Sequence, residues 1–354
     1  MVTVVMFDFA FENNGRMQSD ELTRQFDSNR TLIIITNAAS SVLDRIVIDP
    51  GLDTAPFCCI PISKRFNPQL GNIAHNLKRA EAVLQRAAPV GLDLLVLPEM
   101  AFSGYNFQSM QEISFHLEPT AAGPTTVWAR SIARRLGCHV IVGYPEYCAH
   151  SPSAPQGSIS RYNSAVLVSP KGNVLVNYRK SFLYTTDESW AEEGRGFYAG
   201  DIPGGVGKMS MGICMDLNPK NFVAPFEEYE FANHVLDSGS SLAVVPMAWL
   251  TMQTPESIIE QAQVPDADTL AYWIRRLQPV LERSTVVPGE TIFVTCNRIG
   301  FEGDAVFAGT STIVGIERGN VKVYGCLGRG TEDLLVCDVP GAKFGGVDMS
   351  PRRR

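Results

Sequence analysis

The sequence has few of the features that indicate metal, nucleic-acid or membrane functions. Its 354 residues contain only five histidines and neither an HExxH motif nor a CxxC pair, which argues against the common zinc sites. Acidic residues outnumber basic residues by 37 to 30, and a net charge of −7 disfavours phosphate backbones and anionic membranes as partners. No apolar run approaches the roughly 18 residues needed to span a bilayer. We therefore expect no metal, no nucleic acid and no membrane among the ligands.

Cysteine is present, but not in a pattern that predicts disulfides. Eight cysteines occur, of which Cys58 and Cys59 adjoin and the others are far apart in the sequence. Their density is too low for a disulfide scaffold, and each taken singly is expected to be a small buried hydrophobe. The first apolar run is too short for a secretory signal. These features predict a cytoplasmic protein with reduced cysteines.

The remaining composition is that of a globular protein, with 45% apolar and 19% charged residues. Residues 1–56 show no sustained hydrophobic period, and we expect an N-terminal extension of uncertain structure. From residue 57 helical and strand patterns alternate without a linker-like break, which predicts one α/β domain over 57–340. Residues 341–354 end in three arginines and are expected to be a solvated tail.

Hydrophobic spacing predicts amphipathic helices at 70–88, 124–136, 222–237 and 268–283. Gly137, directly after the second of these, is typical of a helix C-terminus. The apolar run 92–97 is nearly unbroken, which favours a strand that is buried on both faces. Strands are predicted at 92–97, 139–144, 165–168, 174–176, 208–214, 242–247, 291–295, 312–316, 321–324 and 334–339.

Three chemically active residues lie at the ends of predicted strands: Glu99, Lys180 and Cys214. Functional groups in α/β sheets collect beyond the carboxyl ends of strands. A thiol, a carboxylate that takes its proton and an ammonium group meet the requirements of nucleophilic catalysis, and the amine is expected to lower the thiol pKa. Taken singly, the carboxylate is equally typical of a capped turn, the lysine of a surface charge and the cysteine of core packing. The combination is what predicts a site.

The segments around these residues resemble the nitrilase superfamily, whose members use a Glu–Lys–Cys triad. The resemblance covers about 57–340 and rests on 97–105, 178–180 and 212–217, supported by 143–146, 162–165, 296–300 and 307–311. It implies a four-layer α-β-β-α sandwich without a metal or organic cofactor. It also implies that Cys214 is the nucleophile and Glu99 the general acid and base. Lys180 and the backbone N–H of Met215 are implied to hold the oxyanion.

A narrower resemblance is to the fungal protein N-terminal amidases, which act on N-terminal Asn or Gln. It is carried by 66–71, 177–184, 214–219, 246–250 and 272–274. Met215 stands where many nitrilases have an aromatic residue, and Asn218 where many have Arg. One departure concerns the family's first strand, which normally runs straight into the Asn-Pro-Gln segment. Here 60–65 intervenes, and Pro61 cannot donate to a central ladder, so the N-terminal boundary of the domain stays open.

The resemblance implies further residues that contact substrate. Glu188 stands where related amidases carry a second carboxylate, and its neighbour Asp187 competes for that role. Asp187, Glu188 and Asp216 are candidates for binding the substrate's α-ammonium group, although the family's Asp at the last of these positions is often structural. Tyr105 and Trp249 are candidates for pocket walls, with a place in the core as the alternative.

The resemblance thus implies an enzyme that deamidates N-terminal Asn and Gln of polypeptides through a Cys thioester. One alternative is an amidase or carbamoylase of the same superfamily that acts on a small free amide. Another is a catalytically silent scaffold that binds proteins. The preference between Asn and Gln, the tolerance at the second substrate residue and the oligomeric state are left open.

Overall fold

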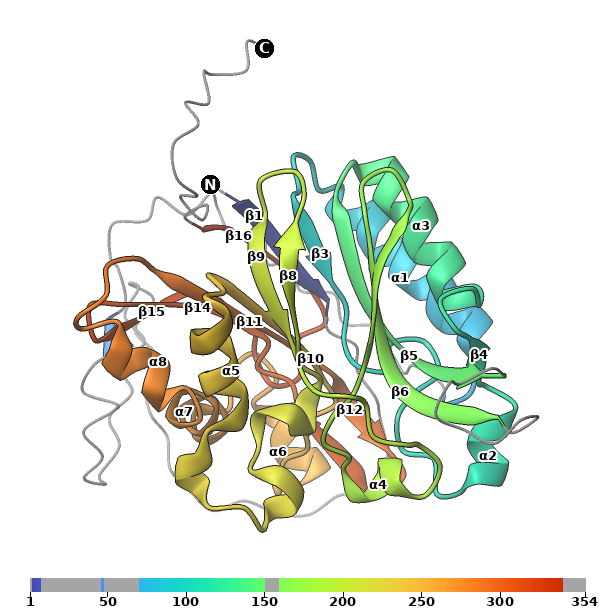
Figure 1. Ribbon diagram of the computed structural model, residues 1–354. Helices are drawn as coiled ribbons and strands as arrows, with labels where there is room; N and C mark the ends of the chain where they lie inside the picture. Colours follow the sequence, from blue (N-terminus) through green and yellow to red (C-terminus); the bar gives the residue numbers. More distant parts are fainter. Residues whose placement is uncertain (1, 8–45, 48–69, 150–158, 340–354) are drawn as a thin grey trace.

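The computed structural model describes residues 2–7, 46–47, 70–149 and 159–339, which form two β-sheets packed between layers of helices (Figure 1). The expectations for the rest of the chain lie outside the described residues. They concern Cys58, Cys59, Pro61, most of the segment 66–71 and the tail. Among the residues that are described, no helix combines the length and the apolar character needed to cross a membrane.

Sheet A, the first of the two, has the strand order β16-β1-β3-β5-β6-β7, with β4 beside β5. The strands β1, β3 and β5 run parallel, whereas β6, β7 and β16 are antiparallel to their neighbours. The strands of sheet A are β1 (Val2–Phe7), β3 (Leu94–Val96), β4 (Glu118–Pro119), β5 (His139–Cys148), β6 (Ser160–Val168), β7 (Val174–Arg179) and β16 (Leu334–Val339).

Sheet B has the order β2-β15-β14-β11-β10-β9-β8, and β9, β10 and β11 run parallel at its centre. A separate hairpin consists of β12 (Ile299–Glu302) and β13 (Ala305–Ala308). The strands of sheet B are β2 (Ile46–Val47), β8 (Tyr198–Ile202), β9 (Gly207–Met211), β10 (Leu242–Met247), β11 (Thr291–Asn297), β14 (Thr312–Glu317) and β15 (Asn320–Cys326).

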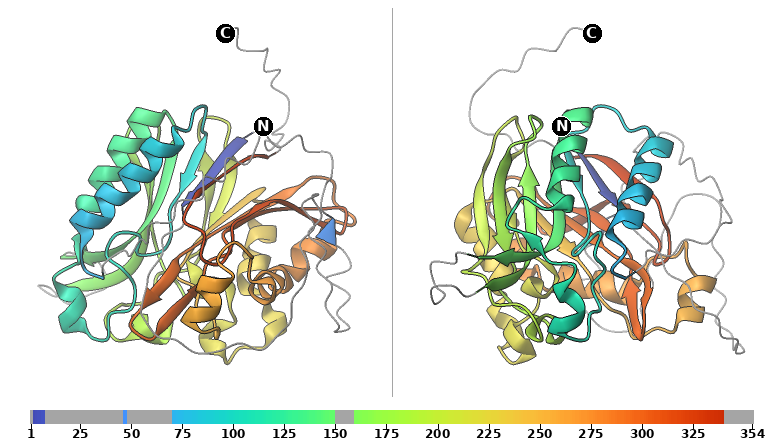
Figure 2. Two further views of the ribbon diagram at one scale, coloured as in Figure 1. Left: turned by 180° about the vertical axis from the view of Figure 1, so that it is seen from behind. Right: turned by 90° about the vertical axis from the view of Figure 1, so that its right-hand side faces the viewer.

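Helices cover the outer face of each sheet (Figure 2). Sheet A is covered by α1 (Ile73–Ala87) and α3 (Pro124–Leu136), and sheet B by α5 (Glu230–Ser238), α7 (Ala267–Arg275) and α8 (Gln278–Arg283). This confirms the four-layer α-β-β-α sandwich. The short elements are α2 (Met110–Ser114), α4 (Thr185–Glu188), α6 (Pro255–Glu260) and the 3₁₀ turns η2 (Cys214–Leu217), η3 (Lys220–Phe222) and η4 (Phe226–Glu228).

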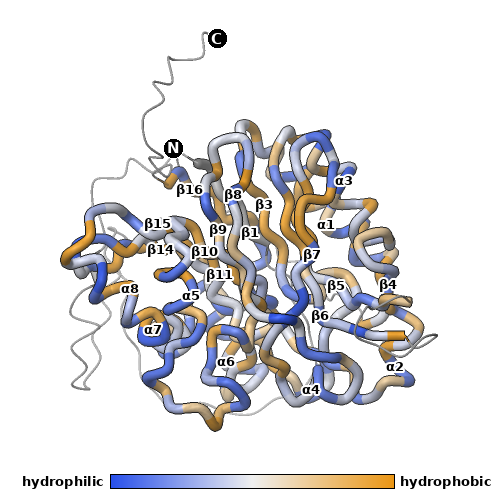
Figure 3. The backbone as a smooth tube through the Cα atoms, viewed as in Figure 1, coloured by the Kyte–Doolittle hydropathy of each residue, from blue (hydrophilic) through white to orange (hydrophobic). Residues whose placement is uncertain are grey.

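Hydrophobic side chains fill both interfaces of sheet A. Successive residues of a strand point to opposite faces, so Leu94 and Val96 pack toward sheet B while Leu95 packs beneath α1 and α3. In Figure 3 the central strands of sheet A are mostly hydrophobic, as expected for strands that are covered on both faces. Helix α3, which has one exposed face, alternates between hydrophobic and hydrophilic residues. The apolar run 92–97 is therefore buried on both faces, as predicted.

The helix predicted at 124–136 is confirmed at both ends. Pro124 occupies its first turn, where a missing N–H is tolerated, and Gly137 follows it with a φ of 67°. The helix predicted at 268–283 is instead two helices, α7 and α8. Pro279 lies in the first turn of α8 and has no N–H to donate to a preceding turn, so a continuous helix is interrupted there.

Two further predictions differ from the structure. The helix expected at 222–237 begins only at Glu230, because Phe222 and Tyr229 both have left-handed backbone conformations. Residues 2–7, expected in an extension of uncertain structure, form β1 between β16 and β3. A single short strand is too short to show a hydrophobic period. Its position in the sheet depends on hydrogen bonds to β16 and β3, which are far away in the sequence.

Candidate active site

The three residues predicted at strand ends come together between the sheets. Glu99 follows β3 and Lys180 follows β7, while Cys214 begins the η2 turn a few residues after β9. The Lys180 ammonium lies 2.7 Å from a carboxylate oxygen of Glu99. The charges of both side chains also act on the pKa of Cys214, which places the thiol beside them. The site is therefore built from loops of both sheets.

Glu99 is fully buried, and both of its oxygens accept hydrogen bonds. Oε1 accepts from Lys180 Nζ at 2.7 Å and from Asn163 Nδ2 at 2.6 Å, whereas Oε2 accepts from the Ala248 N–H at 2.7 Å. Burial raises the pKa of Glu99 above its ordinary value, despite the lowering effect of Lys180. The carboxylate is therefore a stronger base than an exposed glutamate, and Oε2, with one donor, has room for a proton.

Lys180 is also fully buried, and its ammonium group lies between two carboxylates. It donates to Glu99 and, at 2.6 Å, to Asp187 Oδ2. Burial alone would lower the pKa of Lys180, but Asp187 and Glu99 together hold it above its ordinary value. The side chain therefore stays charged. An ammonium group has three N–H donors, so one remains for a bound substrate.

The structure separates the two candidates for the second carboxylate. Asp187 is fully buried in α4, whereas Glu188 beside it is exposed to solvent. Asp187 accepts hydrogen bonds from Lys180 Nζ at 2.6 Å, Asn163 Nδ2 at 2.9 Å, the Tyr184 N–H at 3.1 Å and the Tyr105 hydroxyl at 3.3 Å. Only Asp187 of the two belongs to the cluster.

Cys214 occupies a strained backbone position at the start of η2. Its φ of 42° lies in the left-handed region, which is unfavourable for a residue with a Cβ atom. The first hydrogen bond of the turn runs from the Asp216 N–H to the Ile213 carbonyl at 3.0 Å. The N–H groups of Cys214 and Met215 precede that bond and have no partner within the turn. They are therefore placed to donate to a group bound at the sulfur.

The lowering effect of the amine on the thiol pKa is present as expected, but other effects outweigh it and set the direction of the net shift. Burial and the charge of Glu99 raise the pKa of Cys214 well above its ordinary value, and the ammonium of Lys180 offsets only part of this. The sequence indicated the amine but gave no measure of how deeply the sulfur is buried. Cys214 is only 7% exposed. It therefore rests as a thiol and needs a base to become a nucleophile.

Asp216 has a structural environment. It is fully buried and accepts hydrogen bonds from the Tyr178 hydroxyl at 2.6 Å and from the backbone N–H groups of Ile213 at 2.7 Å, Phe182 at 2.7 Å and Ser181 at 3.0 Å. Both of its oxygens are occupied, which leaves little capacity for a substrate ammonium group. These bonds tie the segment after Lys180 to the turn that carries Cys214.

The two candidate aromatic residues lie beside the cluster in different ways. Tyr105 is buried, and the centre of its ring lies 5.7 Å from Lys180 Nζ. Trp249 is half-buried, and its ring centroid lies 5.6 Å from that of Tyr272. It directly follows Ala248, whose N–H donates to Glu99. Tyr105 therefore supports the charged groups, whereas Trp249 retains a surface that can contact a ligand.

Sequence reasoning missed two residues that organise the site. Asn163 on β6 donates to both carboxylates, and Arg298 donates to the Met100 carbonyl at 2.9 Å directly after Glu99. Arg298 also forms a buried ion pair with Glu302 at 2.5 Å. Both lie in segments that supported the family resemblance, 162–165 and 296–300. Those segments were the available signal, but they carried no indication of a role.

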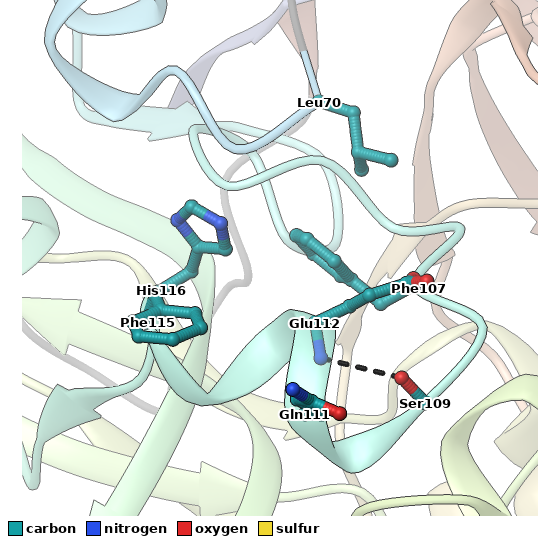
Figure 4. A pocket seen from close by; sticks show the side chains of 7 residues that line it. All are labelled: Leu70, Phe107, Ser109, Gln111, Glu112, Phe115 and His116. Carbon is teal, nitrogen blue, oxygen red and sulfur yellow. Dashed lines mark hydrogen bonds between the residues drawn. The ribbon is translucent and has the colours of Figure 1, made fainter.

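A surface hollow of about 570 Å³ lies elsewhere, against α2 (Figure 4). Its lining includes none of Glu99, Lys180 and Cys214, so the hollow is separate from the cluster that these residues form. No group of His, Cys, Asp and Glu among the residues with described positions is arranged to hold a metal ion. The residues that line the hollow are Leu70, Phe107, Ser109, Gln111, Glu112, Phe115 and His116.

Comparisons with known proteins indicate the family of the chain. The carbon-nitrogen hydrolase family matches residues 65–226. The protein N-terminal amidase of Schizosaccharomyces pombe is 34% identical over 287 residues, which cover 77% of this chain and 96% of that protein. The protein N-terminal amidase of Saccharomyces cerevisiae is 34% identical over 210 residues, which cover 52% of this chain and 44% of that protein.

A solved structure of an N-terminal amidase is also similar to this chain. The crystal structure of an N-terminal amidase with an Asn-Glu-Ala peptide superposes with a TM-score of 0.68 at 25% sequence identity. The match covers 78% of this chain and 96% of that one. The identity and extent of the S. pombe match show the family of the chain. The chain belongs to the carbon-nitrogen hydrolases, and among them to the protein N-terminal amidases.

Proposed function

We propose that this enzyme hydrolyses the side-chain carboxamide of an N-terminal Asn or Gln of a polypeptide, giving Asp or Glu and ammonia. The S. pombe relative is a protein N-terminal amidase, and the structural neighbour was solved with a peptide that begins with Asn. One observation carries the chemistry. A buried ammonium group links Glu99 and Asp187 beside the thiol of Cys214, which is the arrangement that acyl transfer from an amide requires.

In the first half-reaction, Cys214 Sγ attacks the carboxamide carbon while Glu99 Oε2 takes the thiol proton. The new C–S bond converts the carbonyl oxygen into an oxyanion. The third N–H of Lys180 and the N–H of Met215 donate to that oxygen. When the tetrahedral intermediate collapses, the C–N bond breaks and Glu99 passes its proton to the leaving nitrogen. Ammonia departs and a thioester remains on Cys214.

In the second half-reaction, a water molecule attacks the thioester carbon and gives a proton to Glu99. The same donors hold the second oxyanion. The C–S bond then breaks, and the proton returns from Glu99 to the sulfur, which restores the thiol. The product is a chain that begins with Asp or Glu. Asp187 is in contact with the lysine throughout and keeps its ammonium group oriented toward the reacting carbon.

Ammonia release from three compounds tests the function: a peptide that begins with Asn, the same peptide with an acetylated N-terminus, and free asparagine. We expect release from the first alone. Release from free asparagine but from neither peptide would instead favour the small-amide amidase. No release from any of them, with iodoacetamide alkylating Cys214 no faster than other thiols, would favour the silent scaffold.

Two variants test the nucleophile itself. Cys214→Ala is expected to lose ammonia release, because Cys214 supplies the nucleophile and no other cysteine of the described part of the chain is seen to contact Glu99 or Lys180. Cys138→Ala is the matched control, because Cys138 is also a buried thiol but packs beneath α3, and it is expected to keep activity. Ammonia release by the Cys214→Ala enzyme would refute the assignment. The cytoplasmic location and the polypeptide partners inferred from the sequence stay predictions.

A further inference from the structure

We propose that Asn163 is a positioning residue of this site: its side-chain amide joins Glu99 to Asp187 and keeps both carboxylates ionised around one ammonium group. The inference rests on the proposed function, since it assumes that Glu99 is the catalytic base. Asn163 takes no part in the proton transfers of the reaction and acts through Glu99.

The contacts of Asn163 are unusual for a neutral side chain. It is fully buried on β6, and Nδ2 donates to Glu99 Oε1 at 2.6 Å and to Asp187 Oδ1 at 2.9 Å. An amide nitrogen has two N–H groups, so each carboxylate receives one. The backbone carbonyl of Asn163 also accepts a hydrogen bond from the backbone N–H of Lys180 at 2.8 Å. The side chain of Asn163 thus contacts both carboxylates, and its backbone holds the backbone of the lysine beside them.

The charges explain why a neutral donor is needed. Glu99 and Asp187 carry two negative charges and Lys180 one positive charge, all fully buried. The charge of Asp187 acts against the ionisation of Glu99. The other titratable groups near the cluster include, among the described residues, the thiol of Cys214 and the hydroxyl of Tyr105, which are neutral at rest, and the carboxyl group of Asp216, on which the charge of Lys180 also acts. A donor shared by the two carboxylates offsets their repulsion without adding a second cation, which would weaken the base.

The orientation of the amide follows from the same contacts. If it were turned over, its oxygen would face two carboxylates, so the nitrogen must occupy that side. The oxygen Oδ1 is then buried, and no hydrogen-bond partner is found for it among the described residues. An unsatisfied buried acceptor is unfavourable for folding. The amide therefore serves the carboxylates rather than the stability of β6. It fills Oε1 of Glu99 and leaves Oε2 for the thiol proton.

The test compares Asn163→Leu, Asn163→Ser and Asn163→Asp with the wild-type enzyme in the pH dependence of kcat/KM for an Asn-initiated peptide. Loss of the donor favours the protonated form of Glu99, so we expect the acid limb to move up by about one pH unit in Asn163→Leu. Asn163→Ser keeps one donor, so its acid limb is expected to lie between those of the wild-type enzyme and Asn163→Leu. Asn163→Asp adds a third carboxylate and is expected to shift the limb furthest.

Ser164→Ala is the matched control, since Ser164 is the next residue on β6 and donates to a different buried carboxylate, Glu146, at 2.6 Å. It is expected to leave the acid limb in place. A merely structural role for Asn163 would lower kcat/KM equally at every pH. An acid limb unchanged in both Asn163→Leu and Asn163→Ser would overturn the proposal. The two variants differ in size, so at least one is expected to fold.

A second measurement separates this proposal from the proposed function. The pH dependence of Cys214 alkylation by iodoacetamide reports on the base without any substrate. If the peptide is not deamidated but alkylation still shows the shift, the substrate assignment fails and the role of Asn163 stands. If Glu99→Gln leaves the alkylation profile of the wild-type enzyme unchanged, Glu99 is not the base and the role of Asn163 falls with it.

Discussion

Two neighbouring clusters at β6 and β7 each combine a neutral side-chain donor and a cation around a buried glutamate, but the two glutamates differ in their electrostatic state. Asn163 and Lys180 bind Glu99, whereas Ser164 and Arg179 bind Glu146. Ser164 and Arg179 are paired in the sheet, so their side chains lie on the same face. Asn163 precedes Ser164 and Lys180 follows Arg179, so the side chains of Asn163 and Lys180 lie on the opposite face. Sheet A therefore holds one buried glutamate on each side of this strand pair. Both carboxylates are fully buried.

The two glutamates differ in whether the cation beside them is shared with a second carboxylate. Burial acts to raise the pKa of Glu146, but hydrogen bonds from Arg179, Ser164, Thr120 and Asn177 hold it below its ordinary value. Glu99 shares one ammonium with Asp187, and its pKa is raised. Burial therefore does not decide whether a carboxylate is a structural anion or a base. What decides is whether it has a cation of its own.

The largest expected effect comes from removing each cation in turn. Lys180→Met takes away an oxyanion donor and leaves two buried carboxylates unpaired. We expect kcat/KM for an Asn-initiated peptide to fall about a thousandfold, and the free energy of unfolding by about 3–5 kcal/mol. Arg179→Met leaves Glu146 with its neutral donors. It is expected to keep activity while the free energy of unfolding, measured with urea, falls by about 2 kcal/mol.

The contrast between Lys180 and Arg179 would be contradicted if Arg179→Met lowered activity as much as Lys180→Met, or more. A Lys180→Met enzyme with wild-type activity would show that the ammonium group does not act in the reaction. Equal losses of activity in the two variants would mean that the strand pair, rather than either cation, determines catalysis. The activity assay is run at a urea concentration well below the unfolding transition of either variant.

A smaller effect is expected from the second carboxylate. Asp187→Asn leaves Lys180 with a single anionic partner and removes the charge that raises the pKa of Glu99. A weaker base should lower kcat/KM about tenfold to a hundredfold and move the acid limb to lower pH. Glu188→Gln changes the adjacent exposed residue and is expected to leave kcat/KM as it is. The opposite ranking of these variants would return the role to Glu188.

The smallest expected effect is a difference, in acid, between the pH at which activity is lost and the pH at which the protein unfolds. Because the pKa of Glu99 is raised, its folded form takes up a proton more readily than its unfolded form, so protonation stops catalysis without weakening the fold. Glu146 has a lowered pKa, and its stabilising contribution is lost only at lower pH. We expect activity to fall, reversibly, at a pH above that of acid unfolding measured by circular dichroism. Coincident transitions would contradict this.

The convergence of Glu99, Lys180 and Cys214 could be predicted because each lies just after the end of a strand whose apolar run can be recognised, whereas their proposed roles came from the family resemblance. The choice between Asp187 and Glu188 could not be predicted, since one turn of α4 decides which of two adjacent side chains points inward. The direction of the Cys214 pKa shift also depends on burial, which no local pattern reports. The break between α7 and α8 was visible in Pro279, but the apolar stripe across 268–283 outweighed it.

The pairing of β1 with β16 has a consequence for synthesis of the protein on the ribosome. Val2–Phe7 is made well before Leu334–Val339, yet the two strands are neighbours in one sheet. Until β16 emerges, one side of β1 is an open edge that can pair with other chains. Sheet A is completed only after β16 has been made. Until then the nascent chain carries an unpaired strand edge that needs protection.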